Sequence, residues 1–439
     1  MKLIKTFLIN GIIVTITSLI LRCIGLFFNS YISQKIGAEA VGLYGLVMSI
    51  YGFATTIALS GISLATTKIV SEEIAIGNIF GIKNIVRKCL FFSIIFSCIS
   101  SVLLITSAPL ICKIWLHNKI STLPFYIISI SLPFISMSSC LAGYFSAIRN
   151  TIKPSTQLIF EHLLKVVLIS TFLNYFMPCG LEYICISLIL GNIISEIISF
   201  IYIYALYKLD ERKQRNLRHS NNSFVKRILN ITIPVGLTSF VRSGLSTIKQ
   251  VLIPIGFEKN GNTCDQALAN YGLISGMAMP LILFPNTIIL AFSNLLIPEF
   301  SEFKIKKEYS RIKRATKRTI KYTLIFSILI SILMFLFSSQ LSMLLYKSTN
   351  VIKYIKLLSP LIPIMYIDNV VDAILKGLDK QVTVLKINII DLITTISLIL
   401  ILIPKFGING YIFTIYFSEI LNFTLSYKTL YQTCNQNHT

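Results

Sequence analysis

The sequence is poor in charge, and above all in acidic residues. Of its 439 residues only 13% are charged, roughly half the share in soluble domains, and 18 acidic residues stand against 40 Lys and Arg. It has a single Trp, four His and nine Cys, with no CxxC pair. These shortages exclude an ordinary soluble domain, and the His and Cys spacings favour neither a metal site nor a disulfide framework.

Motifs typical of enzymes and of ATP-driven pumps are absent as well. There is no Walker A loop, so ATP is not expected as the direct energy source. No Ser or Cys lies in a recognisable nucleophile elbow. We therefore predict a protein that is not an enzyme and that carries no cofactor or metal. The net charge of +22 does not indicate a nucleic-acid partner, because the Lys and Arg lie in loops between apolar spans.

Long apolar runs recur from one end of the sequence to the other. Hydrophobic residues make up 54% of the chain. With ~20 apolar residues as the unit of a crossing, the pattern predicts an all-α polytopic membrane protein of about twelve transmembrane helices. The expected spans lie near 7–31, 41–67, 89–112, 123–147, 155–177, 183–207, 228–255, 270–298, 322–345, 355–375, 384–404 and 410–429.

The charge of the loops predicts the orientation in the membrane. Segments 208–227 and 304–321 are strongly basic, and both follow an even-numbered span. The opposite loops, around 178–182 and 258–265, are poor in Lys and Arg. Because positive loops stay on the cytoplasmic side, we expect a multi-pass protein of the cell membrane with both termini cytoplasmic.

The sequence also contains an internal echo. Tyr44-Gly45-Leu46-Val47 is repeated as Tyr271-Gly272-Leu273-Ile274, and both stretches end in Ser-Glu. This predicts two six-helix bundles, 1–207 and 228–439, joined by a basic cytoplasmic linker at 208–227. An even number of spans per half gives both bundles the same orientation. We expect a central cavity between them.

The eighth span, within 270–302, is expected to be irregular. Pro280 and Pro285 interrupt its apolar run. A proline inside a membrane helix frees a carbonyl group, which then needs another partner. The two prolines are therefore predicted to act as helix hinges.

Cationic side chains at membrane depth are the first candidates for substrate binding. Arg22, Lys165, Arg242 and Lys249 all lie within predicted spans. Arg242 and Lys249 are two helical turns apart and share a face, as do Arg22 and Asn29. An intramembrane charge is costly unless it is paired or hydrated. Together these residues predict a basic cavity for an anionic group such as a phosphate or diphosphate.

The acidic residues of the spans are candidates for coupling or ion-pair roles. These are Glu161, Asp391, Asp368 and Asp372, whereas Glu196 and Glu419 are expected to pair helices or to face a vestibule. Glu161 precedes Lys165 by four residues, and Asp391 falls opposite Glu161 in the repeat. The two aspartates of the tenth span are expected to be only partly buried. In the alternative interpretation, the cations pair with these carboxylates instead of with a ligand.

Several stretches of the sequence resemble a known family. The most specific is YGLISGMAMPLILFPNTIILAFSNLLIPEFSE from Tyr271, preceded by GLSTIKQVLIP from Gly244. Arg22-Cys-Ile-Gly-Leu, the run IGAEAVGLYG from Ile36 and KPSTQLIFEHLLKV from Lys153 also match. Over nearly its whole length the chain resembles the stage V sporulation protein B family. That family belongs to the multidrug/oligosaccharidyl-lipid/polysaccharide flippase superfamily.

The resemblance implies a flippase for a polyprenyl-diphosphate-linked saccharide, a lipid II-like precursor of spore cortex peptidoglycan. It also implies alternating access around a V-shaped cavity. The basic loops predict contact with membrane lipids, and cell-wall synthases are further expected partners. The chain departs from the family pattern at 142–147, where Ala-Gly-Tyr-Phe-Ser-Ala stands in place of a Gly-Tyr-Phe-Gln-Gly run. Many relatives also carry two further spans, which in lipid II flippases form a groove for the lipid tail.

Two alternative functions compete with the flippase. The first is a cation-coupled drug exporter of the same superfamily, which is disfavoured because the first span carries Arg22 and no acid. The second is a non-transporting membrane scaffold that recruits cell-wall synthases during sporulation. The scaffold predicts that the basic loops matter for function and that the intramembrane cations do not.

Overall fold

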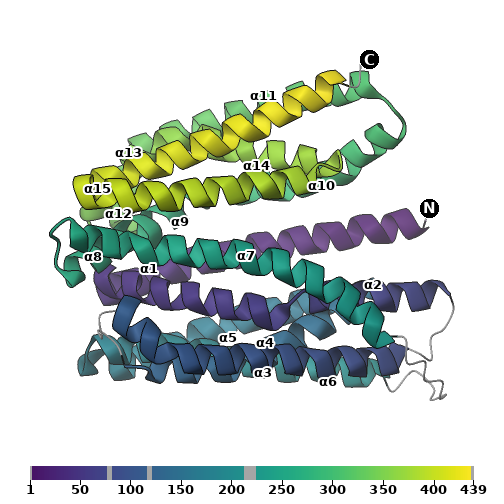
Figure 1. Ribbon diagram of the computed structural model, residues 1–439, viewed down its shortest axis with the longest axis horizontal. Coiled ribbons are helices and arrows are strands. Elements are labelled where there is room, and N and C mark those ends of the chain that lie inside the picture. Colours follow the sequence, from purple (N-terminus) through teal and green to yellow (C-terminus); the bar gives the residue numbers. More distant parts are fainter. Residues whose placement is uncertain (1, 77–81, 116–120, 212–223, 437–439) are drawn as a thin grey trace. The chain divides into compact units, whose positions relative to one another are not determined.

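The computed structural model describes residues 2–76, 82–115, 121–211 and 224–436. Within these ranges the chain forms α-helices with short 3₁₀ and π segments and no strand (Figure 1). Ten helices of this described part are long and apolar enough to cross a membrane. Two of the ten contain a glycine with non-helical backbone angles. Counted on both sides of that glycine, they give the twelve predicted spans, and the all-α polytopic fold is confirmed.

Two glycines divide helices that would otherwise run on as one. Helix α1 (Lys2–Leu59) is interrupted at Gly37, where φ is 77° and ψ is 173°. Helix α15 (Gln381–Gln436) is interrupted at Gly407, where φ is 55° and ψ is −129°. A residue with a Cβ atom adopts these angles only with strain. At Gly407 the chain turns back, so that the two arms of α15 lie side by side (Figure 1).

Contacts divide the chain into two compact units. Unit 1 consists of 1–25 and 46–247, and unit 2 consists of 26–45 and 248–439. The division therefore passes through α1 and through α7 (Phe224–Lys259). The predicted linker at 208–227 is not a boundary in this division, and its residues 212–223 lie outside the described residues. The assignment of two six-helix bundles to 1–207 and 228–439 stays a prediction.

In unit 1, a central helix packs against several neighbours. The helices that follow α1 are α2 (Ile62–Ala75), α3 (Ile82–Trp115), α4 (Leu123–Ala147), α5 (Ile152–Phe176), η2 (Met177–Cys179) and α6 (Leu181–Glu211). Helix α4 contacts α2, α3 and α6, and α6 also packs along α5. Ile69, Ile85, Tyr144 and Ile203 come from four different helices and meet in one buried core. Burial of these side chains stabilises the packing of helix on helix.

Unit 2 is organised around α14. Its elements are residues 26–45 of α1, the end of α7, α8 (Cys264–Tyr271), η3 (Gly272–Ala278), α9 (Met279–Leu283), α10 (Asn286–Ile305), α11 (Tyr309–Leu336), α12 (Ser338–Tyr346), α13 (Asn350–Leu358), η4 (Ser359–Leu361), α14 (Ile362–Gly377) and α15. Helix α14 contacts α10, α11 and α15. Its side chains are accordingly buried on most faces.

The eighth span is irregular, as its prolines predict. A π-helical segment, η3, precedes Pro280, and Pro285 lies in the break between α9 and α10. Two tyrosine hydroxyls donate hydrogen bonds of 2.8 Å to carbonyl oxygens of this stretch. Tyr346 donates to Met277, and Tyr366 donates to Ile282. Side chains thus supply donors where the helical pattern is disturbed. The role of the prolines as hinges stays a prediction.

Candidate functional site

The acidic residues and the two lysines singled out in the spans gather in two clusters, one in each unit. The unit 1 cluster is defined as Tyr51, Ser131, Glu161, Lys165, Asn192, Glu196 and Ser199. The unit 2 cluster is defined as Lys249, Asp368, Asp372, Asp391, Ser418 and Glu419. Each cluster places one lysine near at least two carboxylates. Buried charges require such partners, so each cluster can hold a lysine and carboxylates inside a span.

Glu196 is the most fully bonded carboxylate of the unit 1 cluster. Its side chain is 6% exposed. One carboxylate oxygen accepts a hydrogen bond from the Tyr51 hydroxyl at 2.7 Å, and the other accepts one from the Asn192 amide at 2.8 Å. Ser131 Oγ lies 2.9 Å from the Tyr51 hydroxyl. These bonds link α1, α4 and α6 and fix the position of the Glu196 carboxylate.

Glu161 and Lys165 follow each other by one turn on α5, and both are half-buried. Glu161 accepts a hydrogen bond from Ser199 at 2.8 Å, and Gln157 donates to the same serine hydroxyl at 2.7 Å. Lys165 interacts electrostatically with Glu196 and with Glu161. The lysine predicted from spacing alone is therefore shared by two carboxylates.

In unit 2 the corresponding lysine is Lys249, on the C-terminal part of α7. It interacts electrostatically with Asp391 and Glu419. Asp391 lies on the first arm of α15 and accepts a hydrogen bond of 2.7 Å from Ser418 on the second arm. Thr395 Oγ1 lies 3.4 Å from the same carboxylate oxygen. The two arms of α15 thus hold the acids that face Lys249.

Asp368 and Asp372 lie one turn apart on α14 but differ in burial. The expectation of partial burial is wrong for Asp368, which is 9% exposed, because α14 is surrounded by three helices of unit 2. Its Oδ1 atom has no hydrogen-bond partner among the described residues. Asp372 is half-buried, and its carboxylate accepts from Ser426 at 3.3 Å and lies 3.9 Å from Lys376 Nζ. Asp368 also interacts electrostatically with Asp391 and Glu419.

The two clusters correspond through the internal repeat. Glu196 occurs in Ser195-Glu196-Ile197, in the last span of the first half, and Glu419 occurs in Ser418-Glu419-Ile420, in the last span of the second. Glu161 and Asp391 occupy matching places on the preceding spans. From the sequence, Glu196 and Glu419 are assigned only to helix pairing or a vestibule. The repeated Ser-Glu-Ile is the signal that could have placed them beside the lysines.

The predicted arginines lie outside both clusters. Arg22 and Arg242 are exposed on the parts of α1 and α7 that belong to unit 1. Neither guanidinium makes an ion pair within the described part of the chain. Asn29 is expected on the same helix face as Arg22, and Lys249 on the same face as Arg242. Both Asn29 and Lys249 belong to unit 2. The single basic cavity that would unite all four residues stays a prediction.

Such clusters can exchange electrostatic partners. Each lysine has more than one carboxylate within range. Glu161, Glu196 and Asp391 each also accept a hydrogen bond from a hydroxyl or amide group. These donors remain when the lysine turns toward a bound anion, so the three carboxylates keep a hydrogen-bond partner.

Comparisons with known proteins give one family and one fold. Residues 7–304 match the model described as polysaccharide biosynthesis protein, and residues 261–401 match the model MatE. Stage V sporulation protein B of Bacillus subtilis (strain 168) is 24% identical over 92% of this chain and 80% of its own length.

Two solved structures share the fold. A multidrug resistance MATE family transporter of the MOP superfamily, in an inward-facing conformation, superposes with a TM-score of 0.77 at 13% identity, covering 97% of this chain and 99% of that one. A MOP superfamily transporter from Pyrococcus furiosus gives 0.66 at 12% identity, covering 98% and 96%. At these identities the likeness is one of fold.

Proposed function

Because this chain belongs to the polysaccharide biosynthesis protein family, we propose that it flips a polyprenyl-diphosphate-linked saccharide across the cell membrane by alternating access. The observation that carries the proposal is that Arg22 and Arg242 are cations within apolar membrane spans, and that neither has an ion-pair partner among the described residues. An arginine in such a place is costly unless an anion or water meets it. A diphosphate offers the planar pairs of oxygens that a guanidinium binds best.

The two lysines assist the arginines in this proposal. Lys165 interacts electrostatically with Glu161 and Glu196, and Lys249 with Asp391 and Glu419. When a diphosphate arrives, each lysine exchanges a carboxylate for a phosphate oxygen and returns after release. Asp368 and Asp372 extend the unit 2 cluster as coupling or ion-pair groups. Asn29 is a weaker candidate for substrate contact, since its amide already donates to a backbone carbonyl in unit 2.

The substrate and setting are proposed from the relative. The name of the Bacillus subtilis protein refers to stage V of sporulation. We infer a lipid II-like precursor of spore cortex peptidoglycan as cargo, cell-wall synthases as partners, and a cell-membrane location with both termini cytoplasmic. The 54% hydrophobic composition and the ten apolar helices of the described residues support a multi-pass membrane protein.

The test is complementation of a cortex-deficient sporulation mutant with three forms of the full chain. These are the wild type, Arg22→Ala/Arg242→Ala and the charge-retaining Arg22→Lys/Arg242→Lys, with membrane insertion checked for each. We expect the wild type to restore cortex, the alanine variant to fail and the lysine variant to restore it in part. Full restoration by the alanine variant would refute the role of the arginines.

A control in the same assay separates transport from scaffolding. Lys313 and Lys317 are exposed basic residues on α11 that belong to neither cluster. A scaffold that acts through its basic surface would lose function in Lys313→Ala/Lys317→Ala and keep it in the arginine variant. A flippase gives the opposite pattern.

A drug exporter is the second candidate, because residues 261–401 match the MatE model. The carboxylates of the two clusters could also serve a cation-coupled cycle. Expression in a dye-sensitive strain tests this function. Increased resistance to cationic dyes, lost in Glu196→Gln, would favour an exporter over a flippase.

A further inference from the structure

Helices α10 and α11 of unit 2 enclose a groove of about 430 Å³ that belongs to neither polar cluster. Helix α11 contributes Arg311, Arg314, Arg318 and Tyr322 to its lining. Their spacing of three, four and four residues places all four on one helix face. The groove therefore brings together three guanidinium groups and one aromatic ring along a single stripe.

The facing wall of the groove, on α10, is mainly apolar. Phe292, Leu296, Phe300 and Phe303 line it, and Leu296 and Phe300 are buried at its base. Phe292 is exposed, so the apolar wall continues to the surface. Glu299 is the one acidic side chain among the described residues that line this groove. Three arginines against one glutamate leave the groove positively charged.

The three arginines of the groove differ in the contacts that their guanidinium groups make within the protein. Arg311 forms an exposed ion pair of 2.8 Å with Glu308. Arg318 lies over the ring of Tyr322, 5.6 Å from its centroid. Arg314 has no ion-pair partner in the described part of the chain. Arg314 and Arg318 thus offer, on successive turns, guanidinium groups that form no ion pair with a carboxylate of the described residues and can take a phosphate.

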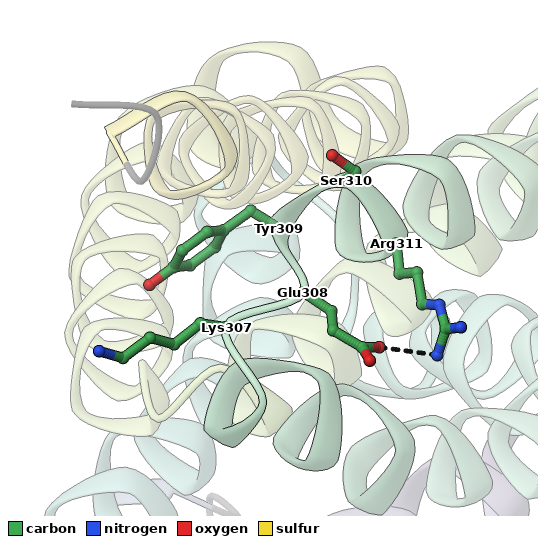
Figure 2. A pocket seen from close by; sticks show the side chains of 5 residues that line it. All are labelled: Lys307, Glu308, Tyr309, Ser310 and Arg311. Carbon is green, nitrogen blue, oxygen red and sulfur yellow. Dashed lines mark hydrogen bonds and ion pairs between the residues drawn. The ribbon is translucent and has the colours of Figure 1, made fainter.

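The groove opens next to a second hollow at the start of α11. Lys307, Glu308, Tyr309, Ser310 and Arg311 line this hollow of about 370 Å³. Figure 2 shows Glu308 and Arg311 turned toward each other, while Lys307 and Tyr309 point to the other side. Arg311 belongs to both hollows, so the positive lining extends beyond the groove itself.

The position along α11 fits the boundary between headgroups and acyl chains. From Tyr309 to Tyr322 the helix carries many Lys and Arg, and beyond Tyr322 its exposed side chains are apolar. Ile325 and Leu329 are both more than half exposed. A surface of this kind faces lipid tails, and the basic segment before it lies at the level of the headgroups.

We propose that this groove is a binding site for an anionic glycerophospholipid. The phosphate diester is held by Arg314 and Arg318, and the acyl chain lies against Phe292, Leu296 and Phe303. Charge complementarity selects an anionic headgroup, and the apolar wall selects a lipid over a free phosphate. The site differs from the general attraction of basic loops to a membrane, because it depends on one face of α11.

The neighbouring residues of α11 provide a matched control. Lys313 and Lys317 are exposed and precede the two arginines by one position each, yet they do not line the groove. The variants Arg314→Gln/Arg318→Gln and Lys313→Gln/Lys317→Gln remove the same charge from the same helix turns. All four side chains are on the surface, so both variants are expected to fold.

The experiment is a thermal-shift titration of the full chain in detergent with dioleoyl phosphatidylglycerol or dioleoyl phosphatidylcholine. A lipid that binds the folded state raises the midpoint of unfolding as its concentration increases. We expect phosphatidylglycerol to stabilise the wild type and the lysine variant, and the arginine variant to bind it on the order of tenfold more weakly. Phosphatidylcholine should produce little shift in any form.

Three outcomes would overturn the proposal. An equal loss in the arginine and lysine variants would indicate diffuse electrostatic attraction. Equal stabilisation by phosphatidylcholine would remove the headgroup selectivity. Equal binding of the water-soluble headgroup glycerophosphoglycerol would indicate a phosphate site that makes no use of the apolar wall. None of these outcomes bears on the flippase proposal, because the groove shares no residue with the two clusters or with Arg22 and Arg242.

Discussion

The side-chain amide of Asn29 donates a hydrogen bond of 2.8 Å to the carbonyl oxygen of Gly276. Gly276 lies four residues before Pro280, so its carbonyl is the group that would accept from residue 280 in a regular α-helix. Proline has no N–H to donate. Asn29, 247 residues earlier in the chain, supplies the missing donor. A polar residue of the first span thereby allows a proline to stand inside the eighth.

This relationship predicts a specific energetic coupling. Asn29→Ala removes the donor and should lower the free energy of unfolding by about 1–3 kcal/mol, the usual cost of an unpaired buried polar group. Pro280→Ala restores a backbone N–H to the helix. The double variant should therefore lose less than the sum of the two single variants, measured as a thermodynamic cycle by thermal unfolding in detergent. Strict additivity would mean that the bond carries no net energy.

The helix crossing at Gly272 predicts intolerance of even one methyl group. A Cβ atom on Gly272 would lie 2.0 Å from the carbonyl oxygen of Ala38, and one on Gly42 would lie 2.1 Å from that of Leu268. Because backbone atoms cannot move aside cheaply, Gly272→Ala should destabilise the protein by about 1–3 kcal/mol. A Cβ atom on Gly25 would meet nothing within 4 Å, so Gly25→Ala is the control and should be neutral or stabilising. Similar unfolding midpoints for both variants would contradict this packing.

The charges of the unit 1 cluster should be energetically coupled. Lys165→Met leaves Glu161 and Glu196 without their shared cation, and we expect it to destabilise the protein. Glu196→Gln/Lys165→Met removes the buried charge together with its partner. Its loss in free energy of unfolding should therefore be smaller than the sum of the two single losses by at least about 0.5 kcal/mol. Tyr51→Phe removes one donor to Glu196 and changes no charge, which makes it the control. Unfolding midpoints of the wild type, of the single variants Lys165→Met and Glu196→Gln, and of the double variant give the coupling directly.

An ion-pair fork joins the start of α7 to the end of α2 in unit 1. Arg227 donates to Glu73 at 3.0 Å and also to Glu72, and Glu73 is buried whereas Glu72 is more accessible. Arg227→Ala should cost about 1.5–3 kcal/mol, because a buried carboxylate loses a charged donor. Arg227→Lys keeps the charge but cannot reach both acids in the same geometry, so an intermediate loss is expected. A lysine variant as stable as the wild type would show that charge alone suffices.

Local sequence is enough to establish the fold class, the places of the twelve spans and the family. These properties depend on composition within short stretches: apolar runs long enough to cross a bilayer, basic loops between them, and a motif around Pro280 and Pro285. The repeat is also visible, because Tyr-Gly-Leu recurs in both halves. Each of these signals can be recognised without knowing which helices pack against the stretch that carries it.

Helix packing, by contrast, selects which polar groups meet. Glu196 interacts electrostatically with Lys165 on the preceding helix and accepts a hydrogen bond from Tyr51 on α1. Glu419 interacts with Lys249, and Asn29 donates a hydrogen bond to Gly276, across helices far apart in sequence. Hydropathy carries no information on which face of one helix meets which face of another. The assignment of 26–45 to unit 2 and the burial of Asp368 depend on the same packing. For that reason the sequence could indicate candidate charges, whereas their pairing had to come from the fold.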